Sequence, residues 1–209
     1  MPSPAIEAAA AESELIRDAL ELAERAHAGQ IRSGSGGMAY IHHPVAVAEL
    51  LAEHGYGEET VAAALVHDVV EDSETSVEEI AARFGPAVAK LVEALTDDES
   101  VEPYERRKDE LRRRVAEAGG DAPAIYAADK LSNVRVLRRA YANEGEAAGK
   151  EFKAPLGTKI EIWEADLAML RAEPSAPEFV EDLASELEQL REARLRTSAA
   201  SGDPAPRRS

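Results

Sequence analysis

Apolar residues recur every three or four positions along almost the whole chain, which is the spacing of helices that bury one face. Alternating stretches of Val, Ile, Thr and Tyr, the pattern of half-buried strands, are scarce. We therefore expect an all-α fold, a bundle of about eight to ten helices. The periodicity predicts helices over residues 13–29, 44–55, 58–72, 76–85, 86–96, 103–119, 122–145, 156–173 and 176–196.

Local signals mark the starts of several of these helices. Pro44 and Pro86 stand where a first helical turn is expected, and Ser76 followed by Glu79 has the pattern of a capping box. No linker divides the chain, so we expect one domain over residues 12–196. The Ala-rich residues 1–11 are expected to be flexible, and residues 197–209 to be a disordered tail, because neither segment has much to pack.

The segment 65–72, LVHDVVED, places one imidazole and three carboxylates in an apolar helix. At about 100° per residue, its polar residues share one face and its Leu and Val residues the other. A solvated face explains acidic residues near a helix end in many proteins. An adjacent His67–Asp68 pair inside an apolar run is instead suited to giving two ligands to one cation.

Further ligands for such a cation stand elsewhere in the chain. The segment YIHHP offers His42 and His43 just before a predicted helix, and AADKLSN offers Asp129, with Asn133 one turn later on the same face. The expected set is His43, His67, Asp68 and Asp129. Such a set leaves coordination positions open for water and substrate, as a catalytic metal requires. His42 remains an alternative to His43, although the position next to Pro44 favours His43.

Composition limits the chemistry. The 209 residues include no Cys, which excludes disulfides, thiolate ligands and Cys nucleophiles. A net charge of −17 argues against nucleic-acid partners, and a phosphate ester would need positive charge supplied locally by a metal or a few basic residues. No segment has the roughly 18 apolar residues of a membrane span, and the start does not have the pattern of a secretory signal. We expect a cytoplasmic protein without a membrane partner.

These motifs resemble a known family. The order H…HD…D is that of the HD-domain phosphohydrolases, and segments 26–51, 63–96 and 127–135 resemble the hydrolase domain of the Rel/SpoT alarmone enzymes. The small stand-alone alarmone hydrolases match best, over residues 12–172. The resemblance implies an HD-domain helical bundle that removes the 3′-diphosphate of the guanosine nucleotide (p)ppGpp, giving pyrophosphate and GDP or GTP. It also implies a metal, typically Mn²⁺, with another divalent cation as the alternative.

The resemblance assigns roles to individual residues. The metal ligands it implies are His43, His67, Asp68 and Asp129. Glu71 and Asp72 match an acidic pair that activates or positions the attacking water. Arg32 matches a basic residue that packs on the nucleobase, and Asn133 a residue of the nucleoside pocket.

Other basic residues near these motifs have two possible roles each. Lys130 is expected either to reach a phosphate or only to pair with Asp129. Arg106 is the strongest candidate of its charged helix for lining the substrate channel, although a solvated helix face is the simpler reading of that helix. Arg135 either contacts a phosphate or holds an acidic neighbour.

Two positions depart from the family pattern. Ser33 stands where a second basic residue is usual, and Val136 where many bacterial relatives have a hydroxyl residue near the guanine. Both concern substrate recognition, so two alternative functions stay open. One is an HD phosphohydrolase for another phosphorylated nucleotide, such as NADPH or another 3′-phosphorylated nucleotide. The other is a non-catalytic nucleotide-binding regulator. The sequence also leaves open a homo-oligomer.

Overall fold

The computed structural model describes residues 4–145, 147–148 and 154–201, with side chains described through Arg196. Helices make up the regular structure of these residues, apart from one isolated antiparallel bridge between Ile31 and Ala39. The predicted all-α class is therefore confirmed. The helices are α1 (Pro4–Glu12), α2 (Glu14–Ala26), α3 (His42–Glu53), α4 (Glu58–Val66), α5 (Val69–Asp72), α6 (Val77–Phe84), α7 (Pro86–Leu95), α8 (Tyr104–Ala118), α9 (Ala122–Glu144), α10 (Leu156–Ala172) and α11 (Val180–Ser201).

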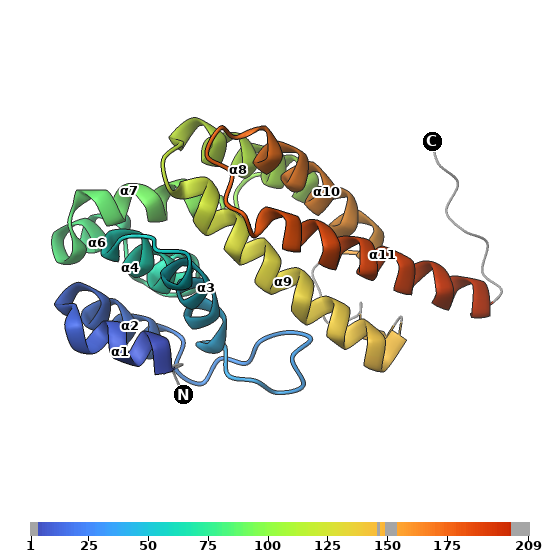
Figure 1. Ribbon diagram of the computed structural model, residues 1–209, viewed down its shortest axis with the longest axis horizontal. Helices are drawn as coiled ribbons and strands as arrows, with labels where there is room; N and C mark the ends of the chain where they lie inside the picture. Colours follow the sequence, from blue (N-terminus) through green and yellow to red (C-terminus); the bar gives the residue numbers. More distant parts are fainter. Residues whose placement is uncertain (1–3, 146, 149–153, 202–209) are drawn as a thin grey trace.

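Helix α9 is the central element of the bundle. Figure 1 shows it running through the molecule with α11 alongside, α8 and α10 near one another, and α1 and α2 at the opposite end. Helix α3 packs against α9 and α4, and α4 packs against α2 and α7. Leu183, Leu187 and Leu190 of α11 are buried, so the C-terminal helix packs on this domain.

The sequences of α4 and α9 explain why both lie in the core. All residues from Thr60 to His67 are buried, and three consecutive alanines in this run let neighbouring helices approach closely. Residues 122–129 are buried in the same way at the start of α9. His67 therefore directly follows one buried helix and Asp129 lies in another, and burial fixes both side chains in place.

The predicted helix over residues 58–72 divides in two. α4 ends at Val66 and α5 begins at Val69, while His67 and Asp68 form a turn between them. Asp68 has a φ of −92° and a ψ of −6°, so its backbone departs from α-helical values. The single polar face expected for this segment is consequently broken, and Glu71 and Asp72 take separate directions.

The ends of the chain differ from expectation in one respect. The segment expected to be flexible contains α1, because Ile6 and Ala10, one turn apart, are buried against α2 and α3. The expected tail, residues 197–209, lies largely outside the described residues, and α11 continues through Ser201. The capping box at Ser76 and Pro86 at the start of α7 are confirmed. None of the described helices is long and apolar enough to cross a membrane.

Candidate metal centre and adjoining cavity

Three helices bring the predicted ligands together. His43 lies in the first turn of α3, His67 directly follows α4, and Asp129 lies in α9. One ligand atom from each of these three residues can be chosen so that all lie within 4.8 Å of one another. His43 Nε2 lies 3.1 Å from Asp129 Oδ1, and His67 Nε2 lies 4.0 Å from the same oxygen.

Asp68 lies beside these three residues. Its Oδ1 is 3.1 Å from His67 Nε2, and its Oδ2 is 3.5 Å from His43 Nε2. The Tyr40 hydroxyl donates a hydrogen bond of 2.7 Å to the same Oδ2, which fixes the carboxylate. The structure thus brings together all four residues expected to bind a metal. His42, the alternative to His43, lines a different cavity, beside Arg139.

The imidazoles have the orientation that a metal ligand needs. His67 Nδ1 lies 2.8 Å from the Ala64 carbonyl, and only an N–H can bond to that acceptor. In the neutral ring Nε2 therefore carries the lone pair, and this buried atom has no hydrogen-bond partner among the described residues. A buried nitrogen without a partner, facing two carboxylates, fits a divalent cation between them.

Ser132 supports His43 in a similar way. Its Oγ lies 3.2 Å from His43 Nδ1 and accepts hydrogen bonds from both terminal nitrogens of Arg32. Arg32 also donates a bond of 3.0 Å to Asn133 Oδ1, and Asn133 Nδ2 donates one of 2.6 Å to Asp129 Oδ1. This network connects two residues assigned to substrate binding with two of the metal ligands.

The electrostatics of the cluster favour cation binding. Burial holds the pKa of His43 below its usual value, whereas the charges of Asp68 and Asp129 outweigh burial and raise the pKa of His67. Burial alone would raise the pKa of Asp129, but Lys130 and His43 outweigh it and hold that pKa well below its usual range. Likewise, His67 and His43 outweigh the effect of burial and lower the pKa of Asp68. Both carboxylates therefore remain ionised.

Glu71 and Asp72 lie differently with respect to the cluster. Glu71 is exposed, lines the cavity of the cluster, and accepts a hydrogen bond of 2.6 Å from the Asp97 N–H. Crowding by protein atoms and the charge of Asp68 raise the pKa of Glu71 to about 7. Asp72 instead faces His27, 3.7 Å from its Nδ1, and does not line that cavity.

Two cavities adjoin at the site. The metal cavity, about 140 Å³, is lined by the four metal-ligand candidates and Glu71. The lysine cavity, about 230 Å³, is named for Lys108, Lys130 and Lys159, which line it. The residues that line both cavities are Tyr40, Lys108, Lys130 and Asn133. A ligand can therefore extend from the metal ligands into the lysine cavity.

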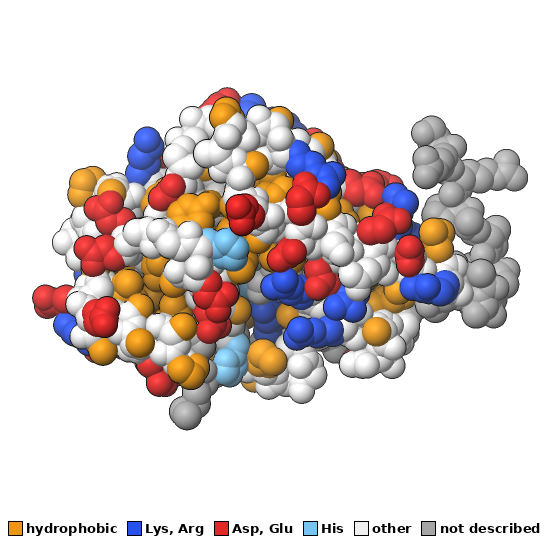
Figure 2. All heavy atoms as spheres, viewed as in Figure 1, with side chains coloured by type: hydrophobic (Ala, Val, Ile, Leu, Met, Phe, Trp, Pro, Cys, Tyr) orange, Lys and Arg blue, Asp and Glu red, His pale blue; other side chains and the backbone are white. Residues whose placement is uncertain are grey.

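Positive charge gathers at this site despite the net charge of −17. The charged residues lining the lysine cavity are Arg32, Lys108, Lys130, Lys159 and Asp166. Figure 2 shows Lys and Arg side chains interspersed with Asp and Glu side chains on the face of the molecule in view. The cavity therefore suits an anion, as the composition required for a phosphate ester.

The other basic residues considered for substrate binding differ in whether they line the two cavities. Lys130 Nζ lies 2.6 Å from Asp129 Oδ2 and also lines both cavities, so pairing and access to a ligand coexist. Arg106 pairs with Glu110 on the solvent side of α8 and lines neither cavity. Arg135 holds the acidic neighbours Asp182 and Glu186 of α11.

Several residues of the site were not singled out by the sequence reasoning. Lys108 lines both cavities although its neighbour Arg106 was preferred, because the sequence alone does not give the rotation of α8. Tyr40 and Ser132 act through hydrogen bonds to ligands far away in the chain, 28 and 89 residues from them. Their places within the motifs YIHHP and ADKLSN were the available signal.

Comparisons with known proteins relate this chain to one family. The family described as HD domain matches residues 19–163. The human guanosine-3′,5′-bis(diphosphate) 3′-pyrophosphohydrolase MESH1 is 38% identical over 130 residues, which cover 61% of this chain and 72% of the human protein. The guanosine-3′,5′-bis(diphosphate) 3′-pyrophosphohydrolase from Aquifex aeolicus is 37% identical over 157 residues. That match covers 72% of this chain but only 22% of the Aquifex protein, so this chain spans less than a quarter of it.

Two solved structures share the fold. One, described as a metazoan ortholog of SpoT that hydrolyzes ppGpp and plays a role in starvation responses, has a TM-score of 0.68 and 25% identity. Its match covers 92% of this chain and 98% of the other. The second is lmo0812 from Listeria monocytogenes, with a TM-score of 0.66 and 29% identity over 75% of this chain and 98% of the other.

Proposed function

Because this chain belongs to the HD domain family, we propose that it is a metal-dependent phosphohydrolase that acts in the cytoplasm on (p)ppGpp. It would remove the 3′-diphosphate, giving pyrophosphate and GDP or GTP. One observation carries the proposal: a cluster of imidazoles and carboxylates that fits a metal adjoins a basic cavity, and the two share four lining residues. The names of the human and Aquifex relatives support this choice of substrate.

We propose Mn²⁺ as the resident cation, with another divalent cation as the alternative. The residues that would hold it are His43, His67, Asp68 and Asp129. When bound, a divalent cation polarises a phosphoryl oxygen and lowers the pKa of a coordinated water. The protein contributes two imidazoles fixed by Ala64 and Ser132 and two carboxylates that stay ionised.

Glu71 is the proposed general base. Its carboxylate lines the metal cavity, and a pKa near 7 lets it hold a proton taken from the attacking water. Asp72 does not line the metal cavity. For Asp72 we propose a positioning role: it faces His27, the His27 ring lies 4.8 Å from that of Tyr40, and Tyr40 donates to Asp68.

Substrate binding is assigned by position around the two cavities. Lys108 and Lys130 line both, so they would neutralise the reacting diphosphate next to the metal ligands. Arg32 and Asn133 would bind the nucleoside, as the family resemblance implies. Within α8 we assign the phosphate contact to Lys108 rather than Arg106, which lies outside both cavities.

A related phosphorylated nucleotide is the second candidate substrate. Ser33 and Val136, which depart from the family pattern, both line the lysine cavity on the side of Arg32. That side would contact the base, so its changed chemistry favours testing NADPH and other 3′-phosphorylated nucleotides. A non-catalytic regulator would not need a proton acceptor in the metal cavity, and the position of Glu71 supports turnover instead.

The proposal is tested with purified protein, freed of metal and reloaded with Mn²⁺, Mg²⁺ or Zn²⁺. We expect Mn²⁺-dependent hydrolysis of ppGpp, and loss of both metal content and turnover in the Asp68→Ala protein. Exposed Lys90 on α7 supplies a control, because Lys90→Ala should leave both unchanged. Turnover of NADPH but not ppGpp would replace the substrate, whereas nucleotide binding without turnover of any candidate would favour a regulator.

A further inference from the structure

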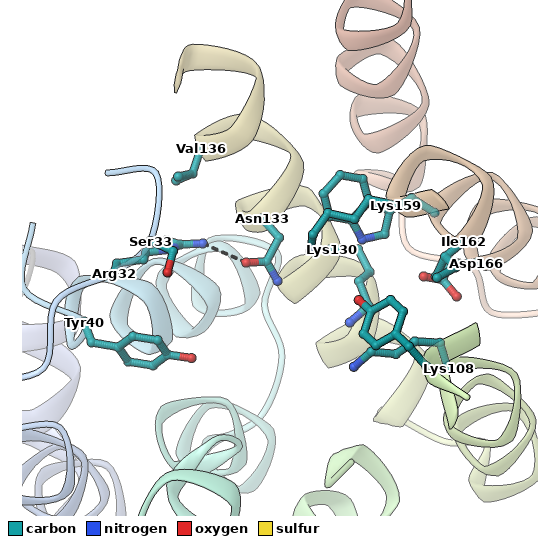
Figure 3. A pocket seen from close by; sticks show the side chains of 12 residues that line it. Arg32, Ser33, Tyr40, Lys108, Lys130, Asn133, Val136, Lys159, Ile162 and Asp166 are labelled. Atoms are coloured by element: carbon teal, nitrogen blue, oxygen red, sulfur yellow. Dashed lines mark hydrogen bonds between the residues drawn. The ribbon is translucent and has the colours of Figure 1, made fainter. Parts of the chain in front are cut away.

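The lysine cavity has two sides with different chemistry. Figure 3 shows Arg32, Ser33 and Val136 on one side of Asn133, and Lys159, Ile162 and Asp166 on the other. The family resemblance gives the Arg32 side to the nucleobase. On the opposite side, formed by α8 and α10, only Lys108 has a role in the proposed reaction, and the α10 residues have none.

This opposite side carries cations placed against aromatic rings. Lys159 Nζ lies 5.3 Å from the centre of the Trp163 ring, and Lys108 Nζ lies 5.4 Å from that of Tyr104. Trp163 is almost fully buried and lines the cavity, so the Lys159 ammonium group lies over an aromatic ring that is itself fixed by packing. Lys159 also lies in the first turn of α10, where the helix dipole adds positive potential.

The acidic group on this side of the cavity is Asp166. Asp166 is fully buried, and its Oδ1 accepts hydrogen bonds from Arg112 Nε at 2.7 Å and from the Tyr126 hydroxyl at 3.0 Å. The carboxylate is thus paired with Arg112, and the charge of Lys130 acts on it as well. Among the described residues, Asp166 is the one acidic residue that lines this cavity, beside three lysines.

Lys159 differs from the two other lysines in its place relative to the metal ligands. Lys108 and Lys130 line both cavities. Lys159 lines the lysine cavity but not the metal cavity. Its ammonium group can therefore meet an anionic group of the ligand other than the one at the metal.

We propose that Lys159, supported by Trp163, forms a second anion subsite that binds the 5′-phosphate groups of the nucleotide. This inference rests on the proposed function, because it takes a nucleotide with phosphates at both ends as the ligand. The 3′-diphosphate lies at the metal cavity, the nucleoside lies beside Arg32 and Asn133, and the 5′-phosphates extend to the α10 side. The subsite makes this enzyme select nucleotides by their 5′ charge.

The test uses ligands that no 3′-hydrolase can turn over. GDP, GMP and guanosine share one nucleoside and differ in 5′ charge, and their affinities for metal-loaded protein are measured by calorimetry. For the wild type we expect affinity to increase from guanosine to GMP to GDP. Lys159→Met should weaken GDP binding about tenfold, the size of one charge-assisted contact, and leave guanosine binding unchanged. Lys159→Arg should retain most of the GDP affinity.

The controls separate a subsite from a general charge effect. Lys90→Met removes a lysine that is exposed on α7, and it should bind all three ligands as the wild type does. Equal affinity of the wild-type protein for GDP and guanosine would overturn the proposal, as would a Lys159→Met protein that binds GDP with wild-type affinity. A loss that is equal for guanosine and GDP would show that Lys159 only supports the fold.

The same variant can be followed in turnover, where the two proposals fail in different ways. With ppGpp, Lys159→Met should raise KM about tenfold, and with guanosine carrying only a 3′-diphosphate it should leave KM unchanged. A wild-type protein that hydrolyses neither compound contradicts the proposed function, while the GDP series still reports on the subsite. Hydrolysis of both with identical KM values in the wild type contradicts the subsite alone.

Discussion

Replacing Arg112 with Met is expected to destabilise the fold by about 3 kcal/mol. Asp166 is fully buried, and Arg112 Nε lies 2.7 Å from its Oδ1. Without Arg112, that carboxylate would keep one neutral hydrogen bond, from Tyr126, while its Oδ2 already has no hydrogen-bond partner among the described residues. Removing one member of a buried pair costs about 3–5 kcal/mol. We expect the lower end of this range, about 3 kcal/mol, because the positive charge of Lys130 also stabilises the Asp166 carboxylate.

Urea unfolding at pH 7, followed by circular dichroism, measures this cost. The neighbouring Arg113 is a matched control, because its pair with Glu117 is exposed on both sides and Arg113→Met should cost at most about 0.5 kcal/mol. Adding Asp166→Asn to the Arg112→Met protein should recover part of the loss, since it removes the unpaired charge.

The pH dependence of this cost has a definite sign. Burial raises the pKa of Asp166 above its usual value, and loss of Arg112 removes an opposing effect and raises it further. A carboxyl group with a raised pKa in the folded state is stabilised by protonation, so the deficit of Arg112→Met should shrink as the pH falls toward 5. A deficit no larger than that of Arg113→Met, or one that grows as the pH falls, would refute the reasoning.

Three further predictions concern the site. Glu71→Gln should lower kcat by about 10²–10⁴, because it removes the proposed base. The wild-type rate should fall as the pH drops below about 7, where Glu71 takes up a proton. A Glu71→Gln variant whose pH–rate profile is the same as that of the wild type would exclude Glu71 as the base. Tyr40→Phe removes the hydrogen bond to Asp68 and should weaken Mn²⁺ binding at least about tenfold in a calorimetric titration, whereas unchanged affinity would show that Asp68 needs no such support. Mn²⁺ at about 100 times its Kd should raise the free energy of unfolding of the wild type by about 2.7 kcal/mol, as measured by thermal unfolding. The His67→Ala protein should be stabilised little by the same Mn²⁺ concentration. Equal stabilisation of both proteins would contradict the proposed ligand set.

The sequence predicted the helices well because most of them bury one face and end at clear signals. Ser76, Pro86 and Gly119 stand at or next to the ends expected for them. The N-terminal helix was missed because Ile6 is a single large apolar residue in an Ala-rich segment, and its burial depends on α2 and α3. The division between α4 and α5 has no Gly or Pro to mark it.

The candidate ligands could be predicted because each stands in a motif whose polar residues interrupt an apolar run. The direction of Asp72 could not, because it depends on the turn at His67 and Asp68. Lys108 and Arg106 lie on one helix of mixed charge, and only the packing of α8 on α7, α9 and α10 shows which of them faces the cavity. Lys159 carries no motif at all, and its role follows from the meeting of α8, α9 and α10 in space.

Identification of the products from ppGpp tests the central claim most directly. Protein loaded with Mn²⁺ is incubated with ppGpp, and the products are separated by anion exchange and identified by ³¹P NMR. The account predicts GDP and pyrophosphate in equal amounts, with no turnover after chelation of the metal or in the Asp68→Ala protein. Release of orthophosphate in place of pyrophosphate, or turnover that persists without the metal, would contradict it.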